Sequence, residues 1–336
     1  MKRIFQTVIC LFIMALTMKA QTAIDLHSHF TTPEFLQALE KHNALLDEGF
    51  PIPAWSLENH LQFMNDAGIS KSVLTLPAPQ PYFGDSEECA AIIRQTNEAA
   101  ARIKAQYPDR FLFCASLPLP DVDAAIKEAT YALDVLHADG VKLATNSRGQ
   151  YLGEEELDPL MQLLSDRGAV VILHPYKPEP FADKLMQQTP LAMYEYLAET
   201  TRALTNMISR NVLARYSGMK VVVPHCGSYL PLSIPRMKAV YPVALAQKMV
   251  GEIDWDANLK CLYYDLAGAP SAQTIKMMLT ITEPSHIMYG TDYPYVAAPV
   301  LTMKIKQLQE ELKADKDLAP YVEMFMKDNA IKLFEK

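Results

Sequence analysis

The chain has 336 residues, of which 50% are hydrophobic and 21% charged, and its formal net charge at pH 7 is -8. This length is enough to bury one large core or two smaller ones, as an enzyme does. The acidic balance and the lack of a basic run exclude nucleic acid as the main partner. None of the 5 cysteines belongs to a CxxC pair, which argues against a zinc ribbon and against a disulfide scaffold.

The first twenty residues have the pattern of a secretory signal peptide. A basic start precedes the mostly apolar run Ile4–Met18, and Ala20-Gln21 offers a cleavage point. The run is short for a membrane span, and an uncleaved signal anchor is the alternative. We therefore expect a signal peptide over residues 1–20 and one mature domain over residues 21–336. That domain would be exported, to the periplasm in a bacterium, and would have no membrane span.

Short apolar runs rich in Val, Ile and Leu recur along the mature chain, with helical stretches between them. Such continuous runs are typical of parallel strands that are covered on both faces. Strands that alternate with helices predict an α/β fold, and eight of them predict a (β/α)8 TIM barrel. A doubly wound open sheet is the alternative, but no GxGxxG opens the first helix. The eight runs are Ala23–His29, Ser72–Leu76, Phe111–Leu117, Val141–Ala144, Val170–His174, Val221–His225, Leu262–Leu266 and Ile287–Gly290.

Helices are expected between these runs, where apolar residues recur at helical spacing. Asp121 is placed as an N-cap, and Gly168 follows the end of another helix as a C-cap residue. The expected helices are Glu87–Lys104, Val122–His137, Glu154–Asp166, Ala192–Arg215, Leu232–Val250, Ala272–Ile281, Ala298–Lys313 and Pro320–Phe334.

The segment Phe30–Ser56 is longer than an ordinary connection from a strand to a helix. It predicts a helix with Thr32 as cap and Pro33 in the first turn. In a barrel, a segment after the first strand lies at the catalytic end. Because it carries Trp55, one of only 2 tryptophans, we expect this insertion to cover the pocket.

The first strand carries the side chains around which the site is expected to form. Side chains alternate along a strand, so His27 and His29 point to the same face. Two imidazoles on one face suit a transition-metal ion. Asp25 points the same way one step earlier, and we expect it to orient a ligand.

Three further polar residues stand at the ends of later strands. His174 ends the fifth run, His225 ends the sixth, and Asp292 follows the eighth. Strand C-termini of a barrel converge on one mouth, so these residues are expected to join the histidines of the first strand.

The donor types predict a site for one divalent metal ion. Imidazole and carboxylate ligands suit Zn²⁺ best, with Mn²⁺ as a possibility. We assign His27, His29, His174 and Asp292 as metal ligands. His225 is then the acid–base group, because a general base must titrate near neutrality and a ligand cannot.

These motifs together resemble the metal-dependent amidohydrolase superfamily, and most closely its aminocarboxymuconate-semialdehyde decarboxylase branch. In that branch an arginine eleven residues after the sixth-strand histidine contacts the substrate carboxylate from the neighbouring subunit of a dimer. Arg236 holds this position, so the resemblance implies a homodimer and a role for Arg236 in substrate binding. Within the branch, the sequences PIPAWSLE at Pro51 and LPLPDVD at Leu117 look most like 6-methylsalicylate decarboxylase-type proteins.

One departure from the branch bears on the substrate. The muconate enzyme uses a further arginine from the segment that corresponds to residues 45–60. This chain has no arginine between Arg3 and Arg94. An aromatic monocarboxylate such as a salicylate is therefore the better expectation than a dicarboxylate.

The expected reaction is the non-oxidative loss of CO₂ from an aromatic carboxylic acid. The metal would orient the phenolate and the carboxylate, and Asp292 or His225 would handle the proton delivered to the ring carbon. Arg236 would clamp a carboxylate. The apolar walls are expected from aromatic side chains, namely Trp55, Tyr176, Tyr229 and Tyr293.

Two other readings remain. The same residues could run a hydrolysis of an amide, ester or lactone through a metal-activated water. In two-metal amidohydrolases a carboxylated lysine of the fourth strand bridges both ions, but Lys142 lies well before that strand's end and is interpreted as structural. An exported binding protein without activity is the third reading, and the full set of metal ligands argues against it.

Overall fold

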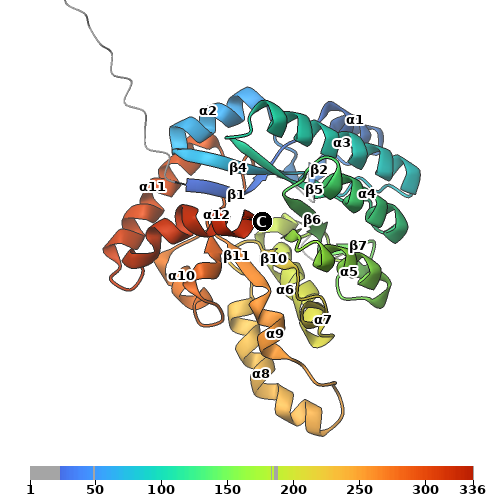
Figure 1. Ribbon diagram of the computed structural model, residues 1–336, viewed down its shortest axis with the longest axis vertical. Helices are drawn as coiled ribbons and strands as arrows, with labels where there is room; N and C mark the ends of the chain where they lie inside the picture. The colour runs from blue at the N-terminus through green and yellow to red at the C-terminus, as the bar shows by residue number, and fades with distance from the viewer. Residues whose placement is uncertain (1–22, 48–49, 183, 185–187, 336) are drawn as a thin grey trace, which may run out of the picture.

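The fold is a ring of parallel strands surrounded by helices, seen in a computed structural model that describes residues 23–47, 50–182, 184 and 188–335 (Figure 1). The predicted signal peptide lies outside these residues. Within them, none of the helices combines the length and hydropathy that crossing a bilayer requires. The strands of the ring are β1 (Ala23–His29), β4 (Ile69–Thr75), β5 (Phe111–Ser116), β6 (Gly140–Ala144), β9 (Val170–His174), β10 (Lys220–Val223), β11 (Leu262–Asp265) and β12 (Ile287–Met288).

The eight strands pair in parallel and in chain order, from β1 to β12. Backbone hydrogen bonds then join the two ends of the sheet. The Leu26 N–H donates to the Tyr289 carbonyl at 2.9 Å, and the His29 N–H donates to the Tyr293 carbonyl at 2.7 Å. The sheet therefore curls into the predicted (β/α)8 barrel, and the doubly wound alternative is wrong.

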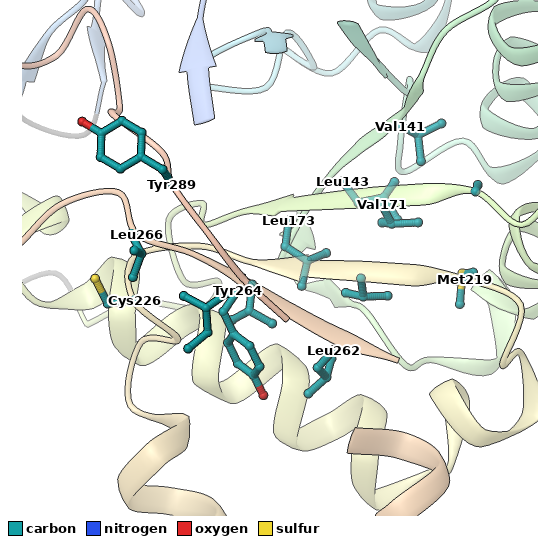
Figure 2. Packing of buried hydrophobic residues seen from close by; sticks show 14 of the residues in the cluster. Val141, Leu143, Val171, Leu173, Met219, Cys226, Leu262, Tyr264, Leu266 and Tyr289 are labelled. Carbon is teal, nitrogen blue, oxygen red and sulfur yellow. The ribbon is translucent and has the colours of Figure 1, made fainter. Parts of the chain in front are cut away.

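The two faces of the strands bury different sets of apolar residues. Inside the ring, Leu26, Val73 and Ile172 pack with Ala330 and Leu333 of α12 (Asn329–Phe334). Helix α12 therefore closes the N-terminal end of the barrel, and it crosses the middle of the ring in Figure 1. Outside the ring, a larger cluster packs the strands against the helices. Figure 2 shows part of this cluster, including Val141, Leu143, Val171, Leu173, Leu262 and Tyr264.

The helices begin where short polar side chains can cap them. The Thr32 hydroxyl accepts from the Phe35 N–H, and the Asp121 carboxylate accepts from the Ala124 N–H, which confirms both predicted caps. The α-helices up to the sixth ring strand are α1 (Pro33–Lys41), α2 (Leu57–Ala67), α3 (Ser86–Gln106), α4 (Val122–Asp134), α5 (Asp158–Asp166), α6 (Glu195–Ser209) and α7 (Val212–Arg215). After it come α8 (Leu230–Ala246), α9 (Trp255–Lys260), α10 (Ala272–Met278), α11 (Ala298–Ala314) and α12.

Several helices differ from the sequence prediction. Helices α2 and α9 were not predicted. The single helix expected over Ala192–Arg215 is a 3-10 turn followed by α6 and α7, because the backbone of Asn211 is left-handed, with φ 53°. The helix expected over Pro320–Phe334 is a 3-10 turn and a π-helical turn before α12.

The predicted insertion after β1 is present. It holds α1 and a small antiparallel hairpin of β2 (Leu46–Asp47) and β3 (Phe50–Pro51). A second small hairpin, β7 (Asn146–Ser147) with β8 (Gln150–Tyr151), follows β6. Both connections follow C-terminal ends of ring strands, so they border the mouth of the barrel.

Candidate metal centre and active site

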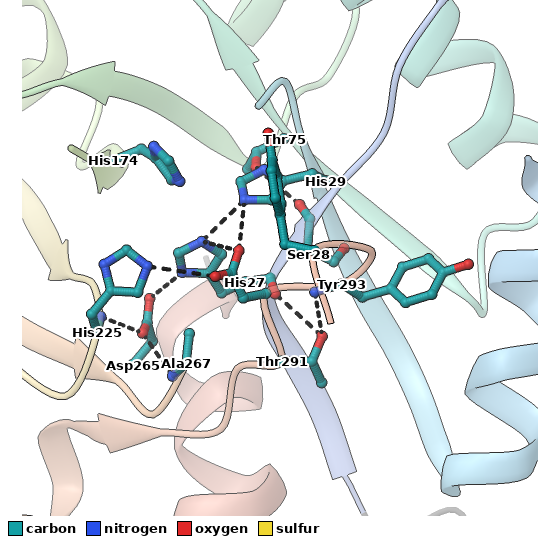
Figure 3. A network of polar contacts seen from close by, with 12 residues as sticks. His27, Ser28, His29, Thr75, His174, His225, Asp265, Ala267, Thr291 and Tyr293 are labelled. Atoms are coloured by element: carbon teal, nitrogen blue, oxygen red, sulfur yellow. Dashed lines mark hydrogen bonds and ion pairs between the residues drawn. The ribbon is translucent and has the colours of Figure 1, made fainter. Parts of the chain in front are cut away.

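Polar side chains from four barrel strands meet at the C-terminal mouth of the barrel (Figure 3). One ligand atom from each of His27, His174, His225 and Asp292 lies within 4.8 Å of the other three. The Nε2 atom of His29 lies 3.2 Å from the Nε2 atom of His27 and 3.2 Å from Oδ1 of Asp292. All five residues expected at the mouth therefore come together there.

The hydrogen bonds of the Nδ1 atom distinguish His225 from the other three histidines. The Nδ1 atom of His27 lies 2.8 Å from Asp265, and that of His174 donates to the Pro175 carbonyl at 2.9 Å. The Thr75 hydroxyl donates to the Ser28 carbonyl, so at 3.0 Å it accepts from Nδ1 of His29. In these three rings Nδ1 is engaged, so Nε2 is the nitrogen that faces the centre, as in a metal ligand.

His225 lacks such a contact. Its Nδ1 atom is buried and has no hydrogen-bond partner among the described residues. Its Nε2 atom lies 3.8 Å from Oδ2 of Asp292. Distance alone would admit His225 as a ligand, but an imidazole without a fixed tautomer is better suited to moving a proton.

The arrangement fits a divalent cation. The Nε2 atoms of His27 and His29 lie 3.2 Å apart beside a carboxylate oxygen, so both nitrogens and the oxygen could bind one cation placed between them. Burial lowers the pKa of His29 to about 4, and it lowers the pKa of His174 well below its usual range. Both rings are therefore neutral donors near neutral pH. Nitrogen and carboxylate donors in this number suit Zn²⁺ or Mn²⁺.

Charges around the centre hold Asp292 in its ionised form. Burial opposes ionisation, but hydrogen bonds from His225 and His29 place the pKa of Asp292 well below its usual range. Burial likewise opposes a charge on His27, yet the carboxylate of Asp265 raises the pKa of His27 to about 9. A cation bound at Nε2 would take the place of the proton that this ring otherwise holds.

Asp25 supports the centre through the backbone. Its carboxylate accepts from the Thr291 N–H at 2.9 Å, from the Thr291 hydroxyl at 2.6 Å and from the His27 N–H at 3.2 Å. These bonds fix the loop that carries Asp292, whose left-handed backbone has φ 63°. Asp25 was expected to orient a ligand, and it contacts no ligand ring; it holds the segment on which Asp292 stands.

Asp265 was missed by the sequence analysis. One of its oxygens binds the ring of His27, and the other accepts from the backbone N–H groups of His225 and Ala267 at 3.0 Å. A signal for it existed, because Asp265 stands one residue before the end of the seventh run, close to the strand end as the other site residues are. It lay inside a run treated as wholly apolar and was passed over.

A cavity of about 580 Å³ opens beside the centre. His174, His225 and Asp292 line its polar end. The rest of the wall is largely apolar, and several of its residues stand exposed at the rim. Apolar and aromatic lining residues include Phe50, Met193, Tyr196, Leu232, Met277 and Tyr295.

The predicted aromatic walls are only partly correct. Tyr229 lines the cavity, whereas Trp55, Tyr176 and Tyr293 do not. The Trp55 N–H donates to Nδ1 of His60 at 3.1 Å, so the indole is held beside α2. The ring of Tyr293 stacks on Phe63 at 4.5 Å and points away from the histidines in Figure 3.

Two further predictions concern the insertion and the arginine. The insertion does reach the cavity, but through Phe50 and not through Trp55. Arg236 lies exposed on α8 and does not line the cavity of its own chain. Its expected contact with substrate would come from a neighbouring subunit, so this position neither supports nor contradicts the prediction.

The barrel and its histidine–aspartate mouth define a metal-dependent hydrolase or lyase, and the comparison with family models gives the family. Residues 24–336 match the amidohydrolase family model, which covers nearly the whole chain, and the protein belongs to this family. The resemblance noted in the sequence is thereby confirmed.

Known relatives of the chain include decarboxylases. A 6-methylsalicylic acid decarboxylase from Aspergillus aculeatus is 32% identical over 321 residues, which cover 93% of this chain and 96% of the relative. A crystal structure of an amidohydrolase II protein has 31% sequence identity and a TM-score of 0.85, and the match covers 94% of this chain and 100% of that one.

Among more distant solved structures, a dihydroxybenzoic acid decarboxylase from Polaromonas sp. with bound manganese has a TM-score of 0.76 at 20% identity. The match covers 94% of this chain and 97% of that one. The expectation of an amidohydrolase-superfamily carboxy-lyase with a divalent-metal site is borne out by these comparisons and by the geometry of the centre.

Proposed function

We propose that the protein is a metal-dependent non-oxidative decarboxylase of a hydroxybenzoic acid, with 6-methylsalicylate as the first candidate. The observation that carries this proposal is the set of imidazoles and one ionised carboxylate at the floor of an apolar cavity. A cavity of this kind suits an aromatic ring, and a charged floor suits a carboxylate and a phenol oxygen. The similarity to a 6-methylsalicylic acid decarboxylase supports the choice of substrate.

We assign His27, His29, His174 and Asp292 as the residues that hold one divalent ion. Zn²⁺ is our first choice from the donor types, and the manganese in a related structure makes Mn²⁺ the alternative. When bound, the ion neutralises and orients the phenol oxygen and the carboxylate of the substrate.

His225 is the residue that we propose to deliver the proton. Its Nε2 atom faces Asp292 at the edge of the cavity, and its other nitrogen is unpartnered among the described residues. Protonation of the ring carbon that bears the carboxylate interrupts the aromatic system. The bond from that carbon to the carboxylate then breaks, its electrons restore the aromatic ring, and CO₂ leaves.

The test is the variant His225→Asn, assayed for CO₂ release from 6-methylsalicylate and other hydroxybenzoates. Loss of a positioned acid–base group costs about 10²- to 10⁴-fold in kcat. Metal content should stay at one ion per chain, because His225 is not a ligand in this proposal. A variant that keeps its activity, or that loses its metal, would contradict the assignment.

The hydrolase reading has less support. Among the described residues, the histidine, cysteine and carboxylate side chains form one cluster able to hold a metal. A single ion suits the decarboxylase branch. Cleavage of esters, lactones or amides by the wild type, without CO₂ release from any aromatic acid, would favour the hydrolase.

We also propose a homodimer. Helix α8 extends away from the ring in Figure 1, and apolar side chains on it are exposed, including Leu232, Val240 and Val243. Arg236 stands on the same helix, so a partner packed there would bring its arginine toward this cavity. Val243→Glu should shift sedimentation to a monomer, and a monomeric wild type would refute the dimer.

Export to the periplasm remains our proposal for the location. Strand β1 begins at Ala23, two residues after the expected cleavage point, so removal of residues 1–20 would leave the barrel whole. N-terminal sequencing of the secreted protein should start at Gln21. A chain that retains Met1 and stays in the cytoplasm would contradict this.

A further inference from the structure

The cavity beside the metal centre is larger than a small aromatic acid requires. Its volume is about 580 Å³, whereas an apolar cavity of about 150 Å³ is enough to hold benzene. 6-Methylsalicylate has almost twice as many non-hydrogen atoms as benzene, so by the same proportion it needs about 280 Å³. With this acid bound at the floor, roughly half of the cavity would stay unfilled. The whole cavity therefore suits a larger ligand, because pockets of about 300 to 1,000 Å³ enclose molecules of drug size.

The wall beyond the floor offers no partner for a second charge. His174, His225 and Asp292 form the floor, and among the described lining residues Asp292 is the one carboxylate, with no lysine or arginine. A phosphate, an ammonium or a second carboxylate on the outer part of a ligand would therefore lose water without gaining an ion pair. The part of the ligand that fills the outer cavity is thus expected to be uncharged.

Two hydroxyl groups of the wall are already bonded within the protein. The Ser228 hydroxyl donates to the Pro224 carbonyl at 3.2 Å, and the Thr274 hydroxyl is hydrogen-bonded to the Ser271 hydroxyl at 2.8 Å. Both Ser228 and Thr274 line the cavity. A polar substituent on the ligand would have to compete with these bonds, whereas an apolar substituent would not. The wall therefore favours an apolar group as well as an uncharged one.

Three apolar side chains line the outer part of the cavity and stand partly in solvent. They are Phe50 on β3, Met193 on the 3-10 turn before α6 and Met277 on α10, and they are 39%, 69% and 38% exposed. Apolar side chains that are exposed together around a cavity mark a binding surface. Two of the three are methionines, whose flexible side chains adapt to ligands of different length. Leu232 lines the cavity too, but it lies on α8, which the proposed partner subunit would cover.

We propose that the substrate is a hydroxybenzoic acid whose ring carries an alkyl chain of several carbons. This rests on the proposed decarboxylation and narrows its substrate class. The carboxylate and the ring lie at the floor, and the alkyl chain runs outward along Met193, Met277 and Phe50. The alkyl chain takes no part in the reaction: the carboxylate leaves as CO₂, a proton takes its place on the ring, and the alkyl chain stays on the phenol that is released. 6-Methylsalicylate is then the shortest member of a series.

The first test uses 6-alkylsalicylates with methyl, propyl, pentyl and heptyl chains. Each CH₂ group that moves from water to the apolar wall should raise kcat/KM about two- to fourfold. The pentyl compound should therefore exceed the methyl compound by at least about 15-fold. Equal values for the two compounds, or a preference for the methyl compound, would overturn the proposal. Either result would mean that the outer cavity is filled by a partner subunit or stays in water when substrate binds.

Variants of the exposed methionines test where the alkyl chain lies. Met193→Ser should lower the ratio of kcat/KM for the pentyl compound to that for the methyl compound about threefold or more, and Met277→Ser should act in the same direction. Met303→Ser is the matched control, because Met303 is 50% exposed but stands on α11 and does not line the cavity. An unchanged ratio in both cavity variants, or an equal fall in the control, would overturn the proposed position of the alkyl chain.

A binding measurement separates this proposal from the proposed function. If the wild type releases CO₂ from none of these acids, the decarboxylase assignment fails, and calorimetric titration of the metal-loaded protein with 3-methylphenol and 3-pentylphenol still tests the site for the alkyl chain. The pentyl compound should bind at least about tenfold more tightly, with a more negative change in heat capacity. Met193→Ser should lose part of this advantage, and Met303→Ser should keep it. Equal affinities of the wild type for the two phenols would reject the alkyl-chain site, whatever reaction the enzyme catalyses.

Discussion

At the scale of single residues, the site depends on side chains that touch no substrate. Asp265 is the clearest case, because one carboxylate fixes the ring of His27 and the backbone of His225. It thereby links a metal ligand to the proposed acid–base group. Both contacts need an acceptor, and Asp265 supplies one oxygen to each.

Asp265→Asn should weaken metal binding about 10- to 100-fold. An asparagine has one acceptor oxygen, so either His27 or the two backbone N–H groups would face its amide nitrogen. Competition with a chelator measures the affinity. Asp139→Asn is the control, since Asp139 accepts a backbone N–H at the other end of a strand. Equal affinities for the metal in wild type and Asp265→Asn would reject the role.

His60 should make the fold sensitive to acid. Burial, with a smaller contribution from Arg110, lowers the pKa of His60 from 6.5 to about 3. The unfolded chain therefore binds a proton below pH 6.5 that the folded chain refuses, and stability falls as the pH drops toward 3. By pH 5 this amounts to about 2 kcal/mol. Urea unfolding at pH 7.5 and pH 5 measures how much free energy of unfolding is lost on acidification. His60→Asn should lose about 2 kcal/mol less than the wild type. An equal loss in both proteins would contradict this prediction.

The residues at strand ends could be predicted from sequence because the C-terminal ends of barrel strands meet at one mouth. The aromatic walls could not. Trp55 turns toward His60, and Tyr293 turns toward Phe63, because neighbours far along the chain decide the direction of a large ring.

At the scale of elements, the loops after β10 and β12 do more than connect. His225 and Cys226 follow β10 with left-handed backbones, each with φ 55°, and Asp292 follows β12 in the same conformation. Such turns aim side chains back over the mouth and cost free energy that local bonds must offset. The bonds from Thr291 to Asp25 are the ones that hold the second loop.

Thr291→Val tests this loop. The change removes a 2.6 Å hydrogen bond to Asp25 and leaves a buried carboxylate oxygen with a poorer set of donors. We expect a loss of about 1 to 3 kcal/mol in the free energy of unfolding and a weaker metal site, because Asp292 is next in the chain. Urea unfolding with and without metal measures both. Thr280→Val is a surface control, and a Thr291 variant that behaves like it would refute the argument.

Strands were easier to predict than helices. Apolar runs marked all eight ring strands, because both faces of a barrel strand are covered. Helix α2 was missed although Ser56 caps it and Gly68 ends it with φ 76°, signals that lay next to a proline-rich stretch. The break between α6 and α7 comes from a left-handed asparagine, which apolar spacing does not reveal.

At the scale of the whole molecule, the metal centre lies at the place where the barrel closes, between its first and last strands. Its proposed ligands come from β1, from β9 and from the loop after β12, and β1 lies beside that loop. A bound ion would therefore link the two sides of the seam, which is the place where β1 meets the loop after β12 and the ring closes. The class of fold could be predicted because strands alternate with helices along the chain. The position of the seam depends on contacts between residues far apart in the sequence, so only the structure shows it.

Removal of the metal should lower the thermal stability of the whole barrel. Metal at one hundred times its dissociation constant adds about 2.7 kcal/mol, which is lost when a chelator removes it. Differential scanning calorimetry with and without chelator measures the shift in Tm. Asp265→Asn should show a smaller shift at the same metal concentration. An unchanged Tm in the wild type would mean that the ion does not bridge the seam.

The chelating groups lie almost at opposite ends of the chain, His27 in the first strand and Asp292 after the last. A ribosome makes His27 and His29 first, His174 later and Asp292 last of the four, and domains fold as they emerge. A growing chain therefore lacks the one carboxylate ligand until the segment after β12 has been made. Capture of the ion then requires all eight strands of the ring, and a product truncated before β12 would stay both open and empty.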